Sequence, residues 1–159
     1  MTPEFHRERY LSIAKKTIAT LNNVMNNISA EDAHAWRDGG KGWTLTEVLC
    51  HLRDYDVIFL NRAKSMLDGS KPSFVYYNHE QMVIDNHYNE QNISDVLAAL
   101  NTSRAEMITF FDGLTTDQFA LEGTHPEYGA WTVMRSLAQV AFHDSNHIEQ
   151  ITRIILEKK

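Results

Sequence analysis

Residues 42–67, "GWTLTEVLCHLRDYDVIFLNRAKSML", carry the clearest helical signal in the chain. Apolar residues recur in this stretch every three or four positions, which predicts a helix with one buried face. Thr44 at the expected N-cap and Glu47 three residues later form a capping-box pattern. The helix is therefore expected to begin at Thr44 and to continue to about Leu67, where "DGSKP" stops it.

Three other segments show the same periodicity. They predict helices from Pro3 to Asn27, from Ser94 to Phe111 and from Thr132 to Leu156. The whole chain contains only 7 glycines and 3 prolines, so little interrupts these helices.

The connections between the helices are polar. Residues 69–91 form a long crossover that is expected to carry a short helical piece from His79 to Asn89, and Ser29 is expected to cap a short extra turn. No segment shows a strand signal, and "EGTHPEYGA" at residues 122–130 is expected to be a loop. The chain is therefore predicted to be all-α. We expect residues 1–159 to form a single domain, a four-helix up-down bundle with a long crossover between helices 2 and 3.

Composition limits the function classes. The 159 residues are 43% hydrophobic and 23% charged, as in ordinary globular proteins. The net charge of −6 argues against nucleic acid and anionic membranes as partners. Cys50 is the single cysteine, which excludes an intrachain disulfide and suits a reducing compartment. With no signal-peptide pattern at its start, the chain is expected to be cytoplasmic. Its expected partner is a small-molecule substrate.

Three histidines share one property of position. The stretch "FHDSNHIEQI" places His143 and His147 four residues apart, where a helix brings both onto one face. On a helical projection this pair flanks the apolar stripe of the last helix, and His51 flanks the stripe of the second helix. Because a buried imidazole is costly without a partner, three of them beside one core require a shared explanation.

A metal site is one such explanation. Three histidines suit Zn²⁺ and leave one coordination position open, and Ni²⁺, Fe²⁺ or Mn²⁺ also accept imidazole. The alternative is a pair of solvent-bonded polar residues, since 8 histidines in 159 residues give about 0.4 such pairs by chance. Cys50 points away from His51 on the helix and is expected to fill space rather than to be a fourth ligand.

Other polar residues near these histidines are candidates for orienting an imidazole or lining a pocket. The candidates are Glu47, Asp54, Tyr55, Asp144 and Gln150. Tyr76 and Tyr77 are further candidates for the pocket wall. His79 and His87 are expected to belong to a polar lid segment, and His125 is given no role.

The chain resembles the DinB-like (DinB/YfiT-like) superfamily of candidate metalloenzymes over nearly its whole length. The resemblance lies in "GWTLTEVLCHLRDYD", in "HDSNHIEQI" and in the arginine-bearing "VLAALNTSRAEMITFFDGL". It implies that His51, His143 and His147 bind one divalent metal within a four-helix bundle that is frequently a homodimer. Characterised members of this superfamily include metal-dependent transferases and isomerases that use low-molecular-weight thiols such as bacillithiol or mycothiol, so the resemblance implies an activity of this kind.

The leading hypothesis is therefore a metalloenzyme in which a cation held by three histidines activates a low-molecular-weight thiol or a water. The nucleophile would attack a small electrophile, with detoxification or stress response as the expected role. The alternative is a non-catalytic, metal-dependent protein that binds or sequesters a small molecule. In a third hypothesis the histidines are structural and the protein acts through a dimer surface.

Overall fold

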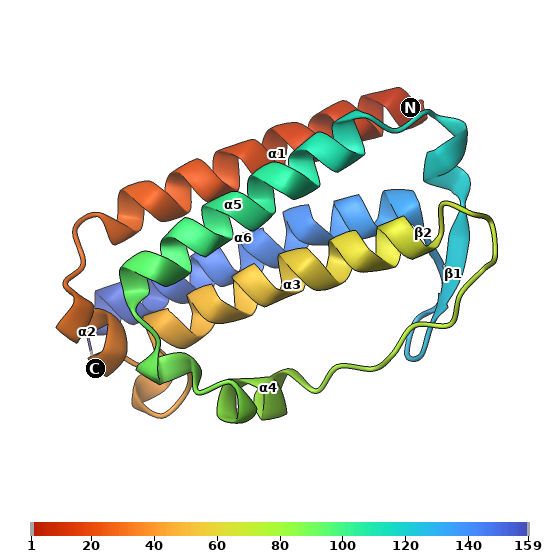
Figure 1. The fold of residues 1–159 in the computed structure, drawn as a ribbon. Coiled ribbons are helices and arrows are strands. Elements are labelled where there is room, and N and C mark those ends of the chain that lie inside the picture. The colour runs from red at the N-terminus through yellow and green to blue at the C-terminus, as the bar shows by residue number, and fades with distance from the viewer. Residues whose placement is uncertain (1, 159) are drawn as a thin grey trace.

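Four long helices form a bundle in the computed structural model, which describes residues 2–158 (Figure 1). The helices are α1 (Pro3–Met25), α3 (Leu45–Ser65), α5 (Ile93–Asp112) and α6 (Val133–Glu157). The predicted bundle and its long crossover are confirmed, and each predicted helix boundary lies within two residues of the observed one. Within the described range, no helix is both long and apolar enough to cross a membrane.

The long crossover sets the directions of the helices. Helix α3 packs against α5 and α6, and α1 packs against the same two helices from the other side. Because residues 66–92 return the chain to the end where α3 began, α5 runs parallel to α3 (Figure 1). Helix α6 runs antiparallel to α3, so residues near the start of α3 face residues near the end of α6.

Each long helix begins with a side-chain cap. The Thr44 hydroxyl accepts from the Glu47 N–H, while the Glu47 carboxylate accepts from the Thr44 N–H at 2.7 Å, which completes the predicted capping box. Asn92 caps α5 and Thr132 caps α6 in the same way. The caps satisfy backbone donors that the first turn of a helix leaves free.

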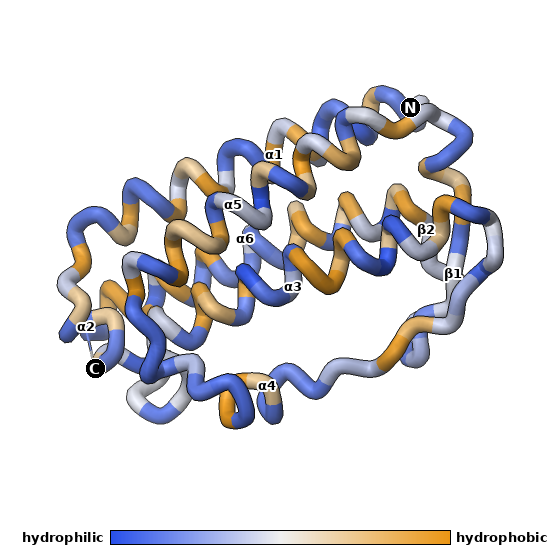
Figure 2. The backbone as a smooth tube through the Cα atoms, viewed as in Figure 1, coloured by the Kyte–Doolittle hydropathy of each residue, from blue (hydrophilic) through white to orange (hydrophobic). Residues whose placement is uncertain are grey.

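The core consists of two apolar clusters along the bundle with a polar layer between them. Apolar and polar positions alternate turn by turn along the long helices, as Figure 2 shows. At mid-height the buried Arg104 of α5 bonds to Asp56 of α3 at 2.9 and 3.0 Å, and to Asp144 of α6 at 2.8 Å. Thr17 of α1 also bonds to Asp144, so this ionic layer joins all four helices.

The short elements agree in part with the sequence prediction. Ser29 caps the short helix α2 (Ala30–Ala35), as expected. The crossover carries α4 (His79–Asp85) and then a 3-10 turn at Tyr88–Glu90, so the predicted helical piece is interrupted after Asp85. Two further 3-10 turns lie at Asp38–Gly40 and Asp117–Ala120.

The prediction of a loop at residues 122–130 was wrong. Strands β1 (Glu122–His125) and β2 (Gly129–Thr132) form an antiparallel hairpin. The crossover pairs with β1, since Phe74 N–H donates to Thr124 O and Thr124 N–H to Pro72 O, both at 2.8 Å. Phe74 also covers Gly123, where a Cβ atom would lie 2.6 Å from its ring. The hairpin depends on these partners 50 residues away, which local periodicity does not report.

Candidate metal centre

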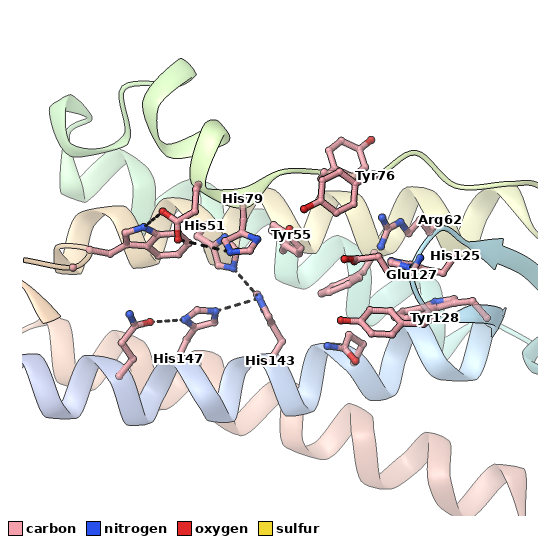
Figure 3. Close-up of a pocket in the computed structure, with 18 of the residues that line it drawn as sticks. His51, Tyr55, Arg62, Tyr76, His79, His125, Glu127, Tyr128, His143 and His147 are labelled. Carbon is pink, nitrogen blue, oxygen red and sulfur yellow. Dashed lines mark hydrogen bonds and ion pairs between the residues drawn. The ribbon is translucent and has the colours of Figure 1, made fainter. Parts of the chain in front are cut away.

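Three imidazoles converge between α3 and α6 (Figure 3). His51 Nε2 lies 2.9 Å from His143 Nε2, and His147 Nε2 lies 3.2 Å from the same atom. One ring nitrogen from each of the three residues falls within 4.8 Å of the other two. The structure therefore brings together the three histidines singled out from the sequence.

The local structure explains why they meet. His143 and His147 are one turn apart on α6, so their rings project from the same face. His51 lies in the first half of the antiparallel α3 and meets them from the opposite side. Its ring packs between Trp43, at 4.9 Å, and Tyr55, at 4.3 Å between ring centroids.

A chain of hydrogen bonds fixes the orientation of His147. Arg153 donates to both oxygens of Asp38, at 2.8 and 2.9 Å, and this pairing lowers the pKa of Asp38, which keeps it an ionised acceptor. Gln150 Nε2 donates to Asp38 at 3.0 Å, so Gln150 Oε1 must face His147 Nδ1, 2.8 Å away. His147 Nδ1 therefore carries the proton, and the lone pair of its Nε2 points at the other two rings.

Burial keeps the imidazoles neutral. Loss of hydration lowers the pKa of His51, and its neighbours His143 and His147 lower it further. Burial and, after it, electrostatic repulsion from the neighbouring His147 lower the pKa of His143 to about 3. Burial also lowers the pKa of His147. At neutral pH all three rings keep free lone pairs, so a cation would not have to displace protons.

These pKa shifts predict that the metal-free protein loses stability in mild acid. An imidazole whose pKa is lowered in the folded state makes its full contribution to the free energy of unfolding above the unfolded-state pKa, near 6.5. This contribution is lost as the pH falls from about 6.5 toward the folded-state pKa. At pH 5, His143 is protonated in the unfolded state but not in the folded state, and this difference is expected to lower the free energy of unfolding by about 2 kcal/mol.

Thermal melting between pH 8 and pH 5 tests this expectation. His143→Gln should melt with a weaker pH dependence than the wild type, because one suppressed protonation is removed. His87→Gln changes an exposed side chain and is the control. A wild-type melting temperature that rises on acidification would contradict the expectation.

The predicted roles of Glu47 and Asp54 in orienting imidazoles need correction. Glu47 is occupied by its helix cap and by Arg37, 3.3 Å away. Asp54 bonds to Arg53 at 2.7 Å and to the Tyr88 hydroxyl at 2.5 Å. Both carboxylates therefore bond to groups other than the histidines, and neither bonds to an imidazole within residues 2–158.

Asp144 also differs from its predicted role, whereas Gln150 agrees with its own. The Asp144 carboxylate points into the ionic layer, where Arg104 and Thr17 are its partners. A 100° step along α6 separates it from the face of His143.

Cys50 is fully buried, and burial raises its pKa to about 12, as suits a space-filling residue.

The histidine cluster opens into a cavity of about 600 Å³, within the range of small-molecule sites. The predicted wall residues Tyr55, Tyr76 and Tyr77 all line it. His79, expected in a polar lid segment, and His125, to which no role was assigned, line it as well, and the His79 ring lies 6.2 Å from that of His51.

Two residues of this site were missed by sequence reasoning. Asp38 follows α2 in a turn, more than 100 residues before the Gln150 that it positions, and no motif marks it. Arg62 lies eleven residues after His51 on α3, close to three full turns and therefore on the same face. That spacing was a usable signal for Arg62.

A model of the DinB superfamily matches residues 14–151. This chain belongs to the DinB superfamily. Among its relatives, a protein of Oceanobacillus iheyensis described as a candidate metal-dependent hydrolase is 23% identical over 146 residues, which cover 92% of this chain and 80% of the relative.

Solved structures of DinB-like bundles share the fold. YfiT from Bacillus subtilis, a candidate metal-dependent hydrolase with an unusual four-helix bundle topology, superposes with a TM-score of 0.85 at 22% identity, covering 95% of this chain and 86% of YfiT. A mycothiol-dependent maleylpyruvate isomerase superposes with a TM-score of 0.75 at 12% identity. This chain is covered to 95% in that comparison and spans 63% of the isomerase.

Proposed function

We propose that this DinB-superfamily protein is a metal-dependent enzyme in which His51, His143 and His147 hold one divalent cation. The observation that carries the proposal is the convergence of three neutral imidazoles at one end of a cavity open to solvent. Two nitrogens bound to one tetrahedral zinc ion at about 2.0–2.1 Å lie about 3.4 Å apart. The observed separations of 2.9 and 3.2 Å are close to that spacing.

The donor set supports a catalytic rather than a structural role. Structural zinc sites are normally closed by four protein ligands, whereas catalytic sites keep one position open. Within the described part of the chain, no carboxylate or thiolate joins the three imidazoles. When bound, a divalent cation supplies Lewis acidity, which lowers the pKa of a coordinated water or thiol.

Other residues of the protein orient the metal-binding histidines and surround the expected substrate position. The Asp38–Gln150 pair holds His147 with its lone pair directed inward. The Tyr55 ring stacks on His143 at 5.1 Å between centroids and limits the movement of that imidazole. The tyrosine rings form an aromatic wall of the cavity, and the substrate's electrophilic carbon would lie between this wall and the histidines.

The Gln150 link gives a prediction for metal affinity. Gln150→Leu removes the acceptor that selects the His147 tautomer, so the affinity for the divalent metal is expected to fall about 10–100-fold. Isothermal titration with the metal measures this. Thr152→Ala, an exposed change two residues away, should leave the affinity unchanged. Equal affinities for all three proteins would mean that the link does not support the ligand.

Activity assays of the metal-reconstituted protein test the proposed function. Hydrolysis of activated esters and amides tests water as the nucleophile, and thiol transfer to small electrophiles tests a low-molecular-weight thiol. Either activity should depend on the metal and disappear in His143→Ala. Stoichiometric metal with no turnover in either screen would favour the alternative of a non-catalytic binding protein.

A further inference from the structure

The cavity has a second polar end, away from the histidine cluster (Figure 3). Arg62 of α3 and the hairpin residues His125, Glu127 and Tyr128 line it. Eleven residues of helix separate Arg62 from His51, which is about 16 Å along the helix axis. A ligand that reaches both ends is therefore an elongated small molecule.

Arg62 is a buried cation that pairs with no carboxylate of residues 2–158. The residue is 8% exposed, and its Nη2 donates to the Val75 carbonyl at 3.0 Å. Its Nε is buried without an acceptor, and it forms no ion pair with any residue from 2 to 158. Its guanidinium lies over Phe74 and Tyr77, 5.4 and 5.6 Å from the ring centroids. Because a buried charge that forms no ion pair is costly, the Arg62 guanidinium can accept an anionic group from a ligand.

The neighbours of Arg62 at this end are a neutral histidine and an exposed carboxylate. The buried His125 accepts the Glu127 N–H at its Nδ1, 3.2 Å away, so the His125 proton is on Nε2 as a neutral donor. Burial lowers the pKa of His125, which keeps this donor neutral. Glu127 lines the same end, but its side chain is exposed and forms no ion pair with Arg62 among the described residues, so it leaves the guanidinium available to a ligand.

We propose that Arg62 binds an oxyanion, a carboxylate or a phosphate, at the end of the substrate remote from the histidines. The substrate class is then a small electrophile with one anionic end and an apolar body that packs against the tyrosine walls. The position of the reacting end rests on the proposed function. Anion binding at Arg62 does not, because Arg62 contacts none of the three histidines.

Matched probes separate charge from shape. Benzoate, phenylphosphonate and inorganic phosphate carry the anion, and benzamide has the shape of benzoate without its charge. Isothermal titration should show that the wild type binds benzoate or phenylphosphonate at least about 10-fold more tightly than benzamide, as a charge-assisted hydrogen bond implies. The preference should persist in His143→Ala, in which a metal cannot be the partner of the anion.

Substitutions at Arg62 complete the test. Arg62→Met should lose the preference for the anion, and Arg62→Lys should keep part of it. Lys64→Met removes the same charge from an exposed position two residues away and should behave as the wild type. Thermal melting of all three variants checks that they are folded.

Three results would overturn the proposal. The first is that no anion binds more tightly than benzamide to the wild type. The second is that Arg62→Met keeps both the preference and the wild-type affinities. The third is an equal weakening of benzoate and benzamide, which would show that Arg62 only holds the crossover through Val75. Metal content, measured separately, shows whether the proposed function fails with it.

Discussion

Replacing His143 by alanine is expected to lower the affinity for the divalent metal by more than about 100-fold, the upper range for loss of an outer-shell partner. The effect is large because His143 Nε2 lies between the other two nitrogens, 2.9 Å from His51 and 3.2 Å from His147. Its removal leaves only two imidazoles, those of His51 and His147, to hold the cation. Competition titration against a chelator measures the affinity of both proteins.

The fold of His143→Ala should survive, because both apolar clusters of the bundle remain intact. Circular dichroism is therefore expected to show unchanged helicity. His87→Ala, at an exposed position of the crossover, is the matched control and should retain wild-type affinity. A His143→Ala protein that unfolds whenever the metal is absent would indicate a structural metal instead.

The second large effect is expected in the ionic layer. Arg104→Met leaves the carboxylates of Asp56 and Asp144 buried without their cation. Breaking a buried ion pair by removing one partner costs about 3–5 kcal/mol, which corresponds to a loss of roughly 6–20 °C in melting temperature for a domain of this size. Urea denaturation gives the free energy of unfolding.

The comparison for Arg104 is the exposed ion pair between Lys64 and Glu106. Lys64→Met removes one charge from a solvated pair and should change the free energy of unfolding by less than about 1 kcal/mol. If Arg104→Met were as stable as Lys64→Met, the buried layer would contribute no more than a surface pair. The link that we describe between the four helices would then not support the fold.

The long helices were predictable because their signals are local. The capping box of Thr44 and Glu47 and the three- and four-residue spacing of apolar positions lie within single segments. The i, i+4 geometry of His143 and His147 is equally local, and the matching face of His51 needed only the helix period. The hairpin at residues 122–132 depends on contacts with Pro72 and Phe74, so its pairing could not be inferred from its own residues.

The surroundings of the histidines were harder to predict than the histidines themselves. Spacing correctly placed Gln150 one turn from His147, but it could not show that Asp144 turns to Arg104 on a neighbouring helix. Asp38 reaches Gln150 from a distant turn. Where several carboxylates are near an imidazole in sequence, their tertiary partners decide which of them orients it.

X-ray absorption spectroscopy of the metal-reconstituted wild type tests whether the three histidines bind the metal, because it reports the atoms bound to the metal. We expect one ion per chain with three imidazoles and a further light-atom ligand that an added small molecule can displace. A sphere with fewer than two imidazoles, or one closed by the sulfur of Cys50, would contradict the site formed by His51, His143 and His147.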